Sequence, residues 1–309
     1  MILVFGSVNL DLVAQVPRLP APGETLAGTS FAALPGGKGA NQALAARRAG
    51  SLVALAAAVG RDAFAGPATA GLVAAGVDMT AVAMVDAPTG VALIHIDARG
   101  ENAITVIAGA NARADASCID AARWSQTTTL LLQLEIPMPA VIVAARDARA
   151  RGIRVVLNAA PMQPLSPTLL AATDILIVNE IEAATLAVAL AINADAHTLA
   201  GALAQRLDIA IVLTLGAHGA IAVARGMHLH ARPPPITVVD STGAGDAFAG
   251  ALAAALDRGA PWPQALVEAV AAGSLACSRV GAQSALADAA KIKAFAQRVE
   301  LVTQISVPS

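Results

Sequence analysis

The stretch DSTGAGD, residues Asp240–Asp246, is the one around which the rest of the sequence is organised. It follows the β-branched run Ile236–Val239, which favours an extended backbone, and precedes the alanine-rich run Ala247–Leu256, which favours a helix. Gly243 and Gly245 leave the backbone free to direct several N–H groups toward one point at the positive end of that helix. Such a point suits a phosphate group or a negative charge that develops during a reaction.

Asp246 stands directly beside this predicted anion site, where a carboxylate is unfavourable unless it has a chemical role. A general base that accepts the proton of a hydroxyl attacking a phosphoryl group would account for the pairing. The alternative is an ordinary tight turn with an aspartate in the first turn of a helix. The stretch alone does not decide between the two, because short glycine motifs also occur without function.

The composition indicates one large α/β domain over residues 1–309 and argues against nucleic acid as a partner. The chain is 56% hydrophobic and 14% charged but only 2% aromatic, so its core must be built from small aliphatic side chains. Its net charge is −2 and its isoelectric point is about 6.2. We find no Lys/Arg cluster of the kind that binds nucleic acid.

The same reading predicts a cytoplasmic protein without a membrane segment. The mean hydropathy of +0.65 is high, but Gly, Pro, Asp or Arg interrupt every apolar run before the ~18–20 residues that a membrane span needs. Residues 1–6 enter a predicted strand without a basic segment, so we expect no signal peptide. Cys118 and Cys277 have no CxxC or metal-ligand spacing and are read as free thiols.

Strand and helix patterns alternate along most of the chain. The predicted strands are 2–8, 52–59, 129–134, 153–157, 174–178 and 209–213. The predicted helices are 40–48, 62–75, 137–151, 180–189, 195–206, 261–278 and 287–299, and we expect almost only helix after residue 246. Continuous apolar strands separated by helices indicate a parallel sheet that is covered on both faces.

Two segments, 11–34 and 89–107, interrupt this alternation. The first has a short predicted strand on either side of Pro20–Gly23, and the second reads as a hairpin with its turn at Ala98–Gly100. Neither contains a crossover helix, so we expect neither to join the parallel sheet. Together they predict a small strand layer, a lid, whose exposed face would be covered by substrate or by a second subunit. We therefore expect a homodimer.

A second glycine cluster, GGKGAN at Gly36–Asn41, precedes the first long helix. Its bare backbone permits the close approach of a polar ligand, and Asn41 can both donate hydrogen bonds to hydroxyls and accept them. The spacing is neither that of a Walker phosphate loop nor that of the dinucleotide fingerprint. A loop that only caps a helix is the alternative, but Lys38 and Asn41 favour a ligand.

These segments resemble the signature segments of the ribokinase family of carbohydrate kinases. The resemblance rests on GSVNLD at 6–11, GGKGAN at 36–41 and DSTGAGD at 240–246, and it extends over the whole chain. Shorter matches are QLE at 133–135, NEIE at 179–182, TLGAHG at 214–219 and GAQ at 281–283. The resemblance implies a ribokinase-like three-layer fold with a mostly parallel central sheet and a small β lid. It also implies ATP-dependent phosphorylation of D-ribose at O5.

The resemblance assigns expected roles to individual residues. Asp246 would be the catalytic base, and the N–H groups of Gly243, Ala244 and Gly245 would form the anion hole. The residues implied for the sugar are Asn9, Asp11, Gly37, Lys38, Gly39, Asn41, Glu135 and Asp246. Those implied for the nucleotide are Asn179, Thr214, Gly216, Ala217, His218, Gly219, Gly245 and Val270.

ATP, Mg²⁺ and a monovalent cation, usually K⁺, are the implied cofactors. Glu182 would hold Mg²⁺ through water, and the residues implied for K⁺, largely through backbone carbonyls, are Asp240, Thr242, Ala276, Arg279, Gly281 and Ala285. The family commonly has Pro-Ser where Ser284–Ala285 stand here, so a side-chain oxygen for the cation is missing or shifted to Ser284. Val270 stands where a polar residue often borders the nucleotide.

Plainer readings stay open for several of these residues. Asn179 and Glu182 would cap a helix, Asn9 and Asp11 would form a turn at a strand end, and Glu135 would face a helix dipole. The open alternatives for function are a kinase for deoxyribose, fructose or a nucleoside, and a non-catalytic sugar or nucleotide sensor. A nucleoside would need an aromatic shelf, which a chain with no Tyr and five Phe supplies poorly.

Overall fold

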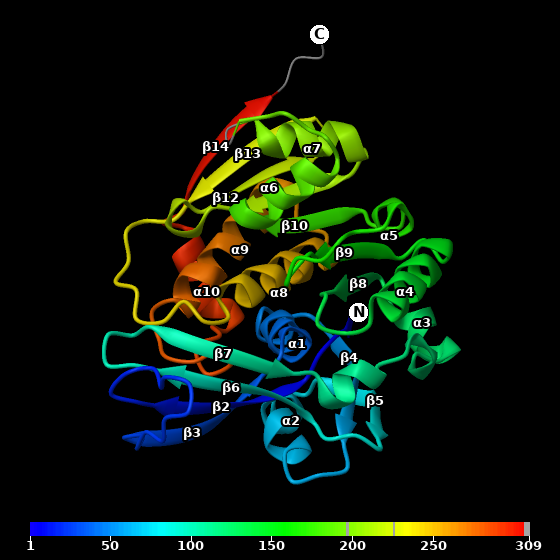
Figure 1. Ribbon diagram of the computed structural model, residues 1–309. Helices are drawn as coiled ribbons and strands as arrows, with labels where there is room; N and C mark the ends of the chain where they lie inside the picture. The colour runs from blue at the N-terminus through cyan, green and yellow to red at the C-terminus, as the bar shows by residue number, and fades with distance from the viewer. Residues whose placement is uncertain (196–197, 225, 306–309) are drawn as a thin grey trace.

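A large sheet runs through the protein and carries most of its strands. The computed structural model describes residues 1–195, 198–224 and 226–305. The strands of this sheet are β1 (Ile2–Phe5), β4 (Val53–Gly60), β5 (Asp78–Val85), β8 (Thr129–Leu132), β9 (Arg154–Asn158), β10 (Ile175–Asn179), β11 (Ala210–Thr214), β12 (Ala220–Ala224), β13 (Met227–Arg232) and β14 (Glu300–Ile305). Their order is β14-β13-β12-β11-β10-β9-β8-β1-β4-β5 (Figure 1). Every pair from β5 to β11 is parallel, whereas β12, β13 and β14 add an antiparallel edge.

Helices cover both faces of this sheet and make a three-layer fold. They are α1 (Lys38–Arg48), α2 (Ala65–Ala74), α3 (Ala121–Gln126), α4 (Met138–Ala150), α5 (Pro167–Ala171), α6 (Glu180–Ala189), α7 (Leu199–Leu207), α8 (Ala244–Asp257), α9 (Trp262–Ala276) and α10 (Ala289–Ala296). Successive side chains of a strand point to opposite faces. Ile2 and Val4 of β1 accordingly join the core beneath α1, α8 and α9, whereas Leu3 and Phe5 join the core beneath α4 and α6.

Helices α1 and α8 approach each other closely because their contact is made by small residues. A Cβ atom at Gly250 of α8 would lie 2.6 Å from Cβ of Ala45 and 2.7 Å from the carbonyl oxygen of Gln42, both on α1. Separations this short leave no room for a side chain at residue 250. The bare backbone there sets the distance between the helix that begins in the GGKGAN cluster and the helix that begins in DSTGAGD.

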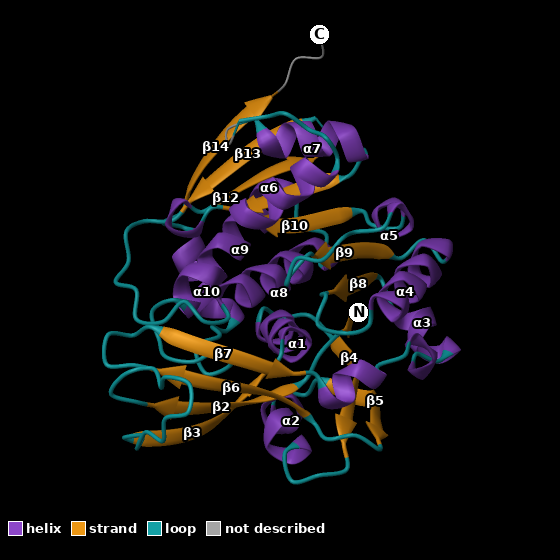
Figure 2. Ribbon diagram, viewed as in Figure 1, coloured by secondary structure: helices purple, strands orange, loops and turns teal. Residues whose placement is uncertain are grey.

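A second sheet has four strands and stands apart from the large one (Figure 2). Its strands are β2 (Asn9–Gln15), β3 (Ser30–Gly36), β6 (Gly90–Ile96) and β7 (Asn102–Ile107), in the order β3-β2-β6-β7. The pair β2–β6 is parallel and the other two pairs are antiparallel. The expected hairpin and the expected strands around Pro20–Gly23 are confirmed, as is their exclusion from the parallel sheet.

The strands and helices predicted for the parallel region are present, mostly with ends shifted by a few residues. Residues 196 and 197 of the predicted helix 195–206 lie outside the described part, and α7 begins at Leu199. The expectation of almost only helix after residue 246 is wrong, because β14 pairs with β13 along the edge of the sheet. A strand whose partner is so distant in the sequence leaves no local pattern.

The run Ile236–Val239, which favours an extended backbone, forms a loop rather than a strand. The N–H of Val239 donates to the carbonyl of Cys277 at 2.8 Å. In the described residues we find no helix with the length and apolar character of a bilayer span.

Candidate functional site

Polar side chains gather where the parallel strands end. Asn9 follows β1, Glu135 follows β8, and Asn158, Asn179 and Thr214 are the last residues of β9, β10 and β11. The first turns of α1 and α8 lie at the same edge, because Asn41 on α1 is hydrogen-bonded to Asp246 on α8. Open parallel sheets bind their ligands at the carboxyl ends of their strands. Most of the residues predicted for the site are therefore brought to this edge.

The turn before α8 requires glycine and leaves open space beside it. Gly243 is the N-cap residue, with φ +75°, and a Cβ atom there would lie 2.9 Å from Cα and Cβ of Ala282. A Cβ atom at Gly245, in contrast, would meet no heavy atom of the described residues within 4 Å. First-turn N–H groups of a helix have no intrahelical acceptor. That of Ala244 donates to the carbonyl of Ser241 at 3.2 Å.

Asp246 is buried, with 6% of its surface exposed, and its carboxylate is held from α1. Oδ2 accepts a hydrogen bond from Nδ2 of Asn41 at 2.9 Å, and Oδ1 accepts one from Nε2 of Gln42 at 2.8 Å. Burial raises the pKa of Asp246, and the charge of Lys38 and the two amide donors only partly oppose this shift. The site thus holds a carboxylate with high proton affinity beside a helix N-terminus.

The GGKGAN loop is tied to Glu135. Oε2 of Glu135 accepts hydrogen bonds from Oγ of Ser7 at 2.6 Å and from the backbone N–H of Lys38 at 2.9 Å. The N–H of Gly39 donates to the same Ser7 hydroxyl at 3.3 Å. A Cβ atom at Gly39 would lie 2.5 Å from the backbone nitrogen of Ser7. The glycines predicted to bind the sugar therefore also let this loop approach the end of β1.

Asp11 lies among other acids. Burial, Glu135 and Asp246 together raise the pKa of Asp11 to about 6. A Cβ atom at Gly36 would come within 2.3 Å of Oδ2 of Asp11, so the bare backbone makes room for the carboxylate. Burial disfavours the charged form of Lys38, but Asp246, Glu135 and Glu182 outweigh it and raise the pKa of the ammonium group. Lys38 is therefore a cation that is stabilised by three acids.

Asn9 is positioned by a residue that the sequence did not point to. Its Oδ1 accepts a hydrogen bond from Nδ2 of Asn111 at 2.7 Å. Asn111 also accepts from the N–H of Val8 at 2.9 Å and donates to the carbonyl of Val8 at 3.1 Å. Gln42, Gln133, Asn158 and Gln283 are buried near Asp246 and were missed in the same way. The local signals were the adjacency of Gln42 to Asn41 and the presence of Gln133 and Gln283 in the short matches QLE and GAQ, to which no role was assigned.

Asn179 and Glu182 form the capping arrangement that the plainer reading described. Oδ1 of Asn179 accepts from the N–H of Glu182, and Oε2 of Glu182 accepts from the N–H of Asn179, each at 2.8 Å. Burial raises the pKa of Glu182, against the opposing effects of the Asn179 N–H and of Lys38. The charge of Lys38 thus acts on Glu182 across the site.

The remaining residues predicted for the nucleotide lie in two places. Thr214 ends β11, and its Oγ1 lies 3.4 Å from the carbonyl of Val178. Gly216, Ala217 and His218 form a short 3₁₀ turn that ends at Gly219, where φ is +84°. Val270 is buried in α9 with 4% of its surface exposed.

Asp240 joins the segments predicted for the monovalent cation. Its Oδ1 accepts from the N–H of Thr242 at 2.9 Å, and its Oδ2 accepts from the N–H of Gly281 at 2.8 Å. Burial would raise the pKa of Asp240, but these hydrogen bonds outweigh burial and lower it. The N–H of Arg279 donates to the carbonyl of Ala276 at 3.4 Å.

Two small residues lie at the end of this region. Ala285 is buried, with 2% of its surface exposed. Ser284 donates its hydroxyl proton to the carbonyl of Val280 at 2.7 Å. The structure thus brings residues 240–242 and 276–281 together, and Ser284 has a local acceptor for its proton.

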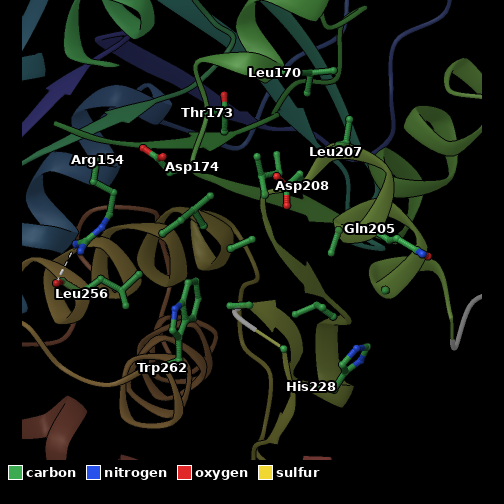
Figure 3. Close-up of a pocket in the computed structure, with 18 of the residues that line it drawn as sticks. Arg154, Leu170, Thr173, Asp174, Gln205, Leu207, Asp208, His228, Leu256 and Trp262 are labelled. Carbon is green, nitrogen blue, oxygen red and sulfur yellow. Dashed lines mark hydrogen bonds between the residues drawn. The ribbon is translucent and has the colours of Figure 1, made fainter. Parts of the chain in front are cut away.

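A cavity of about 1830 Å³ lies at the opposite edge of the sheet (Figure 3). Its walls come from the first residues of β9 and β10, near Arg154 and Asp174, and from the start of α9 at Trp262. Arg154 donates there to the carbonyl of Leu256 at 3.0 Å. The cavity adjoins the amino ends of the strands and includes none of the residues predicted for sugar or nucleotide.

The chain is similar to known carbohydrate kinases. The family model for pfkB family carbohydrate kinases matches residues 1–289. The chain is 35% identical over 287 residues to the ribokinase of Haemophilus influenzae, covering 92% of this chain and 94% of that one. It is 34% identical over 258 residues to the deoxyribokinase of Salmonella typhi, covering 82% and 84%.

Solved structures confirm the predicted fold. The structure of Arabidopsis thaliana ribokinase complexed with ribose and ATP matches with a TM-score of 0.88 and 29% sequence identity, covering 96% of this chain and 98% of that one. The resemblance drawn from the glycine clusters is confirmed as well, since the matching region contains all of them. The chain belongs to the pfkB family of carbohydrate kinases.

Proposed function

We propose that this protein is an ATP-dependent kinase that phosphorylates D-ribose at O5. The observation that carries the proposal is the buried carboxylate of Asp246, held by Asn41 and Gln42 beside the glycine N-terminus of α8. This arrangement puts a base and an anion site next to each other, which is what transfer of a phosphoryl group to a hydroxyl needs. The ribokinase relatives and the structure complexed with ribose and ATP support ribose and ATP as the substrates.

In the proposed reaction the proton of the ribose O5 hydroxyl passes to Asp246. The O5 electron pair forms a bond to the γ-phosphorus of ATP, and the bond from that phosphorus to the bridging oxygen breaks and releases ADP. The N–H groups of Gly243, Ala244 and Gly245 stabilise the charge that develops on the transferred group. Asn9, Asp11, Lys38, Asn41 and Glu135, together with the backbone of Gly37 and Gly39, bind the sugar hydroxyls.

We assign the nucleotide to the ends of β10 and β11 and the cations to the segments beside them. Asn179, Thr214, Gly216, Ala217, His218, Gly219, Gly245 and Val270 are the residues proposed to border ATP. Glu182 would hold Mg²⁺ through water, a mode that needs only one or two carboxylates. This fits the described residues, which contain no group of three His, Cys, Asp or Glu side chains able to hold a metal. When bound, the metal would neutralise charge on the phosphates.

A monovalent cation such as K⁺ would lie between the segments that Asp240 joins. Oxygen atoms are the appropriate donors for a hard cation. The N–H groups of Thr242 and Gly281 both donate to Asp240, which brings the backbones of the two segments together. The residues proposed to hold it are Asp240, Thr242, Ala276, Arg279, Gly281 and Ala285, with Ser284 as the nearest side-chain hydroxyl.

The four-stranded sheet is proposed to act as a lid and as a dimer interface. One face of this sheet exposes apolar side chains, with Leu34 at 38%, Ile104 at 54% and Val106 at 58% exposed. An apolar face of this kind favours a partner surface. A second copy of the same sheet offers a matching one, since a two-fold interface uses the same surface on both subunits.

Turnover on a panel of acceptors tests the substrate assignment. We expect kcat/KM for D-ribose to exceed that for 2-deoxyribose, fructose and adenosine by tenfold or more, about 1.4 kcal/mol of transition-state stabilisation. ADP release in a coupled assay measures it, with ATP held in excess. A larger kcat/KM for deoxyribose, which the similarity to a deoxyribokinase makes the main competitor, would reassign the substrate and leave the chemistry intact.

Asp246→Asn tests the base. The variant keeps the size and one acceptor oxygen but cannot take the hydroxyl proton, so we expect kcat to fall at least ~100-fold. Ribose binding, measured by calorimetry without ATP, should be partly retained. Turnover close to that of the parent enzyme would remove Asp246 from this role.

Asp11 predicts a pH dependence for sugar binding. Its pKa of about 6 leaves it mostly ionised at pH 7 and mostly protonated at pH 5, where it loses an acceptor for sugar hydroxyls. We therefore expect ribose affinity to fall as the pH is lowered through 6, and Asp11→Asn to bind weakly with little pH dependence. Calorimetry at pH 5, 6 and 7 measures both. Asp115→Asn is the matched control, since the pKa of Asp115 lies below its usual value; a flat profile in the parent contradicts the assignment.

Light scattering tests the dimer. We expect a mass of twice 30.7 kDa at micromolar concentration, and a shift toward the monomer in Ile104→Asp, because a charge would be buried at the interface. Val188→Asp is the control, since Val188 is 82% exposed on α6, outside the lid. A monomeric parent chain rules the dimer out.

A further inference from the structure

A chain of buried amide side chains ends on the two carboxylate oxygens of Asp246. On one side, Nε2 of Gln133 donates to Oε1 of Gln42 at 2.6 Å, and Nε2 of Gln42 donates to Oδ1 of Asp246 at 2.8 Å. On the other side, Nε2 of Gln283 donates to Oδ1 of Asn41 at 3.1 Å, and Nδ2 of Asn41 donates to Oδ2 of Asp246 at 2.9 Å. We call these four residues the amide chain.

Every hydrogen bond in the amide chain has the same direction, with the donor on the outer residue and the acceptor closer to Asp246. The consequence appears at the two outer ends. Oε1 of Gln133 and Oε1 of Gln283 are buried, and within the described part of the molecule neither has a hydrogen-bond partner. Buried acceptors without partners are unfavourable. Turning either outer amide around would place its oxygen against the oxygen of the next residue, so the orientation is imposed by the carboxylate.

Gln42 is the central member because it also connects Asp246 to the large sheet. Its Nε2 donates a second hydrogen bond, to Oδ1 of Asn158 at the end of β9, at 2.9 Å. Nδ2 of Asn158 in turn lies 3.4 Å from the carbonyl of Ile177 on β10. The carbonyl oxygen of the Gln42 amide accepts one hydrogen bond and its nitrogen donates two, and Gln42 has no exposed surface.

We propose that Gln42 is a positioning residue of the phosphoryl transfer, which holds the carboxylate of Asp246 ionised and in a single orientation. The proposal rests on the function proposed above, in which Asp246 is the base. A base must be ionised before the hydroxyl attacks, and burial works against ionisation. Hydrogen bonds donated to a carboxylate stabilise its charged form, and Gln133 keeps the donor of Gln42 turned toward Asp246.

Three charged groups also act on Asp246. Lys38 on α1 favours its ionised form, whereas Glu135 after β8 disfavours it, and Asp11 on β2 is coupled to it in the same unfavourable sense. These three groups stay in place when Gln42 is replaced by an uncharged residue. A change in the titration of Asp246 in such a variant would therefore report the loss of the amide donor.

Gln42→Met is the first test, because methionine is unbranched, has a similar length and cannot donate. We expect the acidic limb of the pH profile of kcat to move upward by about one pH unit, and kcat at pH 7 to fall about tenfold. KM for ribose should change less than about threefold, since Gln42 has no exposed surface and is not among the residues proposed to bind the sugar. A merely structural role would lower stability without moving the pH profile. Gln264→Met is the matched control, because Gln264 is exposed on α9 and is bonded to Glu268.

Gln133→Met is the second test and keeps the proposal decidable if Gln42→Met does not fold. It removes the hydrogen bond that Gln133 donates to Gln42 and leaves both hydrogen bonds to Asp246 intact. We therefore expect a smaller upward shift of the acidic limb of the kcat profile. A pH profile that superimposes on that of the parent in a folded Gln42→Met or Gln133→Met variant overturns the proposal. Should Asp246→Asn stay active, the base role itself fails. If Asp246→Asn is inactive but the pH profiles of the glutamine variants do not move, only the role proposed for Gln42 is ruled out.

Discussion

The burial of one carboxylate between two helix N-termini is the constraint on which the rest of the site depends. Asp246 lies on α8, and both side chains that donate to it lie on α1. A charge with 6% exposure is tolerated only when donors are held in place around it. The two helices must therefore keep a fixed separation, and the absence of a side chain at Gly250 allows them to pack at that distance.

Glycine and alanine serve this constraint throughout the site. The bare backbone at Gly39 lets the loop before α1 approach the end of β1, and the bare backbone at Gly36 leaves room for the carboxylate of Asp11. At Gly245, in contrast, the space beside the backbone is open among the described residues, and there the proposed transferred phosphoryl group would lie. The low aromatic content of the chain, 2%, agrees with a molecule in which close backbone approach organises the centre.

The charges of the site act on one another but do not cancel. Lys38 is coupled to Asp246, Glu135 and Glu182, whereas the neighbours that act on Asp11 are the acids Glu135 and Asp246. Such a site is costly in the free protein, since Asp11 and Asp246 both carry raised pKa values. Functional sites commonly concentrate this kind of perturbed acid, because a base with high proton affinity is useful for catalysis.

Local sequence predicted the elements whose cause is local. Apolar strands such as Val53–Gly60, and glycines that terminate helices, gave the parallel core. The small sheet was predicted from its turns and from the lack of crossover helices. The edge strand β14 was not, because its hydrogen bonds go to β13, about seventy residues earlier in the chain. Asn179 and Glu182 are the opposite case. They lie three residues apart in the sequence, and the helix cap expected from them is present in the structure as a capping box.

The sequence by itself determined the fold class, the family and the residues that carry charge or bare backbone, since each of these is written in contiguous stretches. Only the tertiary structure decided how those residues are connected. Gln133 and Gln283 lie in the short matches QLE and GAQ, and Gln42 and Asn111 lie in none, but the roles of all four come from hydrogen bonds to residues more than ninety positions away. The physical reason is that an amide side chain looks the same in sequence whether it faces water or a buried carboxylate. Its partner, and with it its contribution to the site, exists only after α1, α8 and the strand ends have packed together.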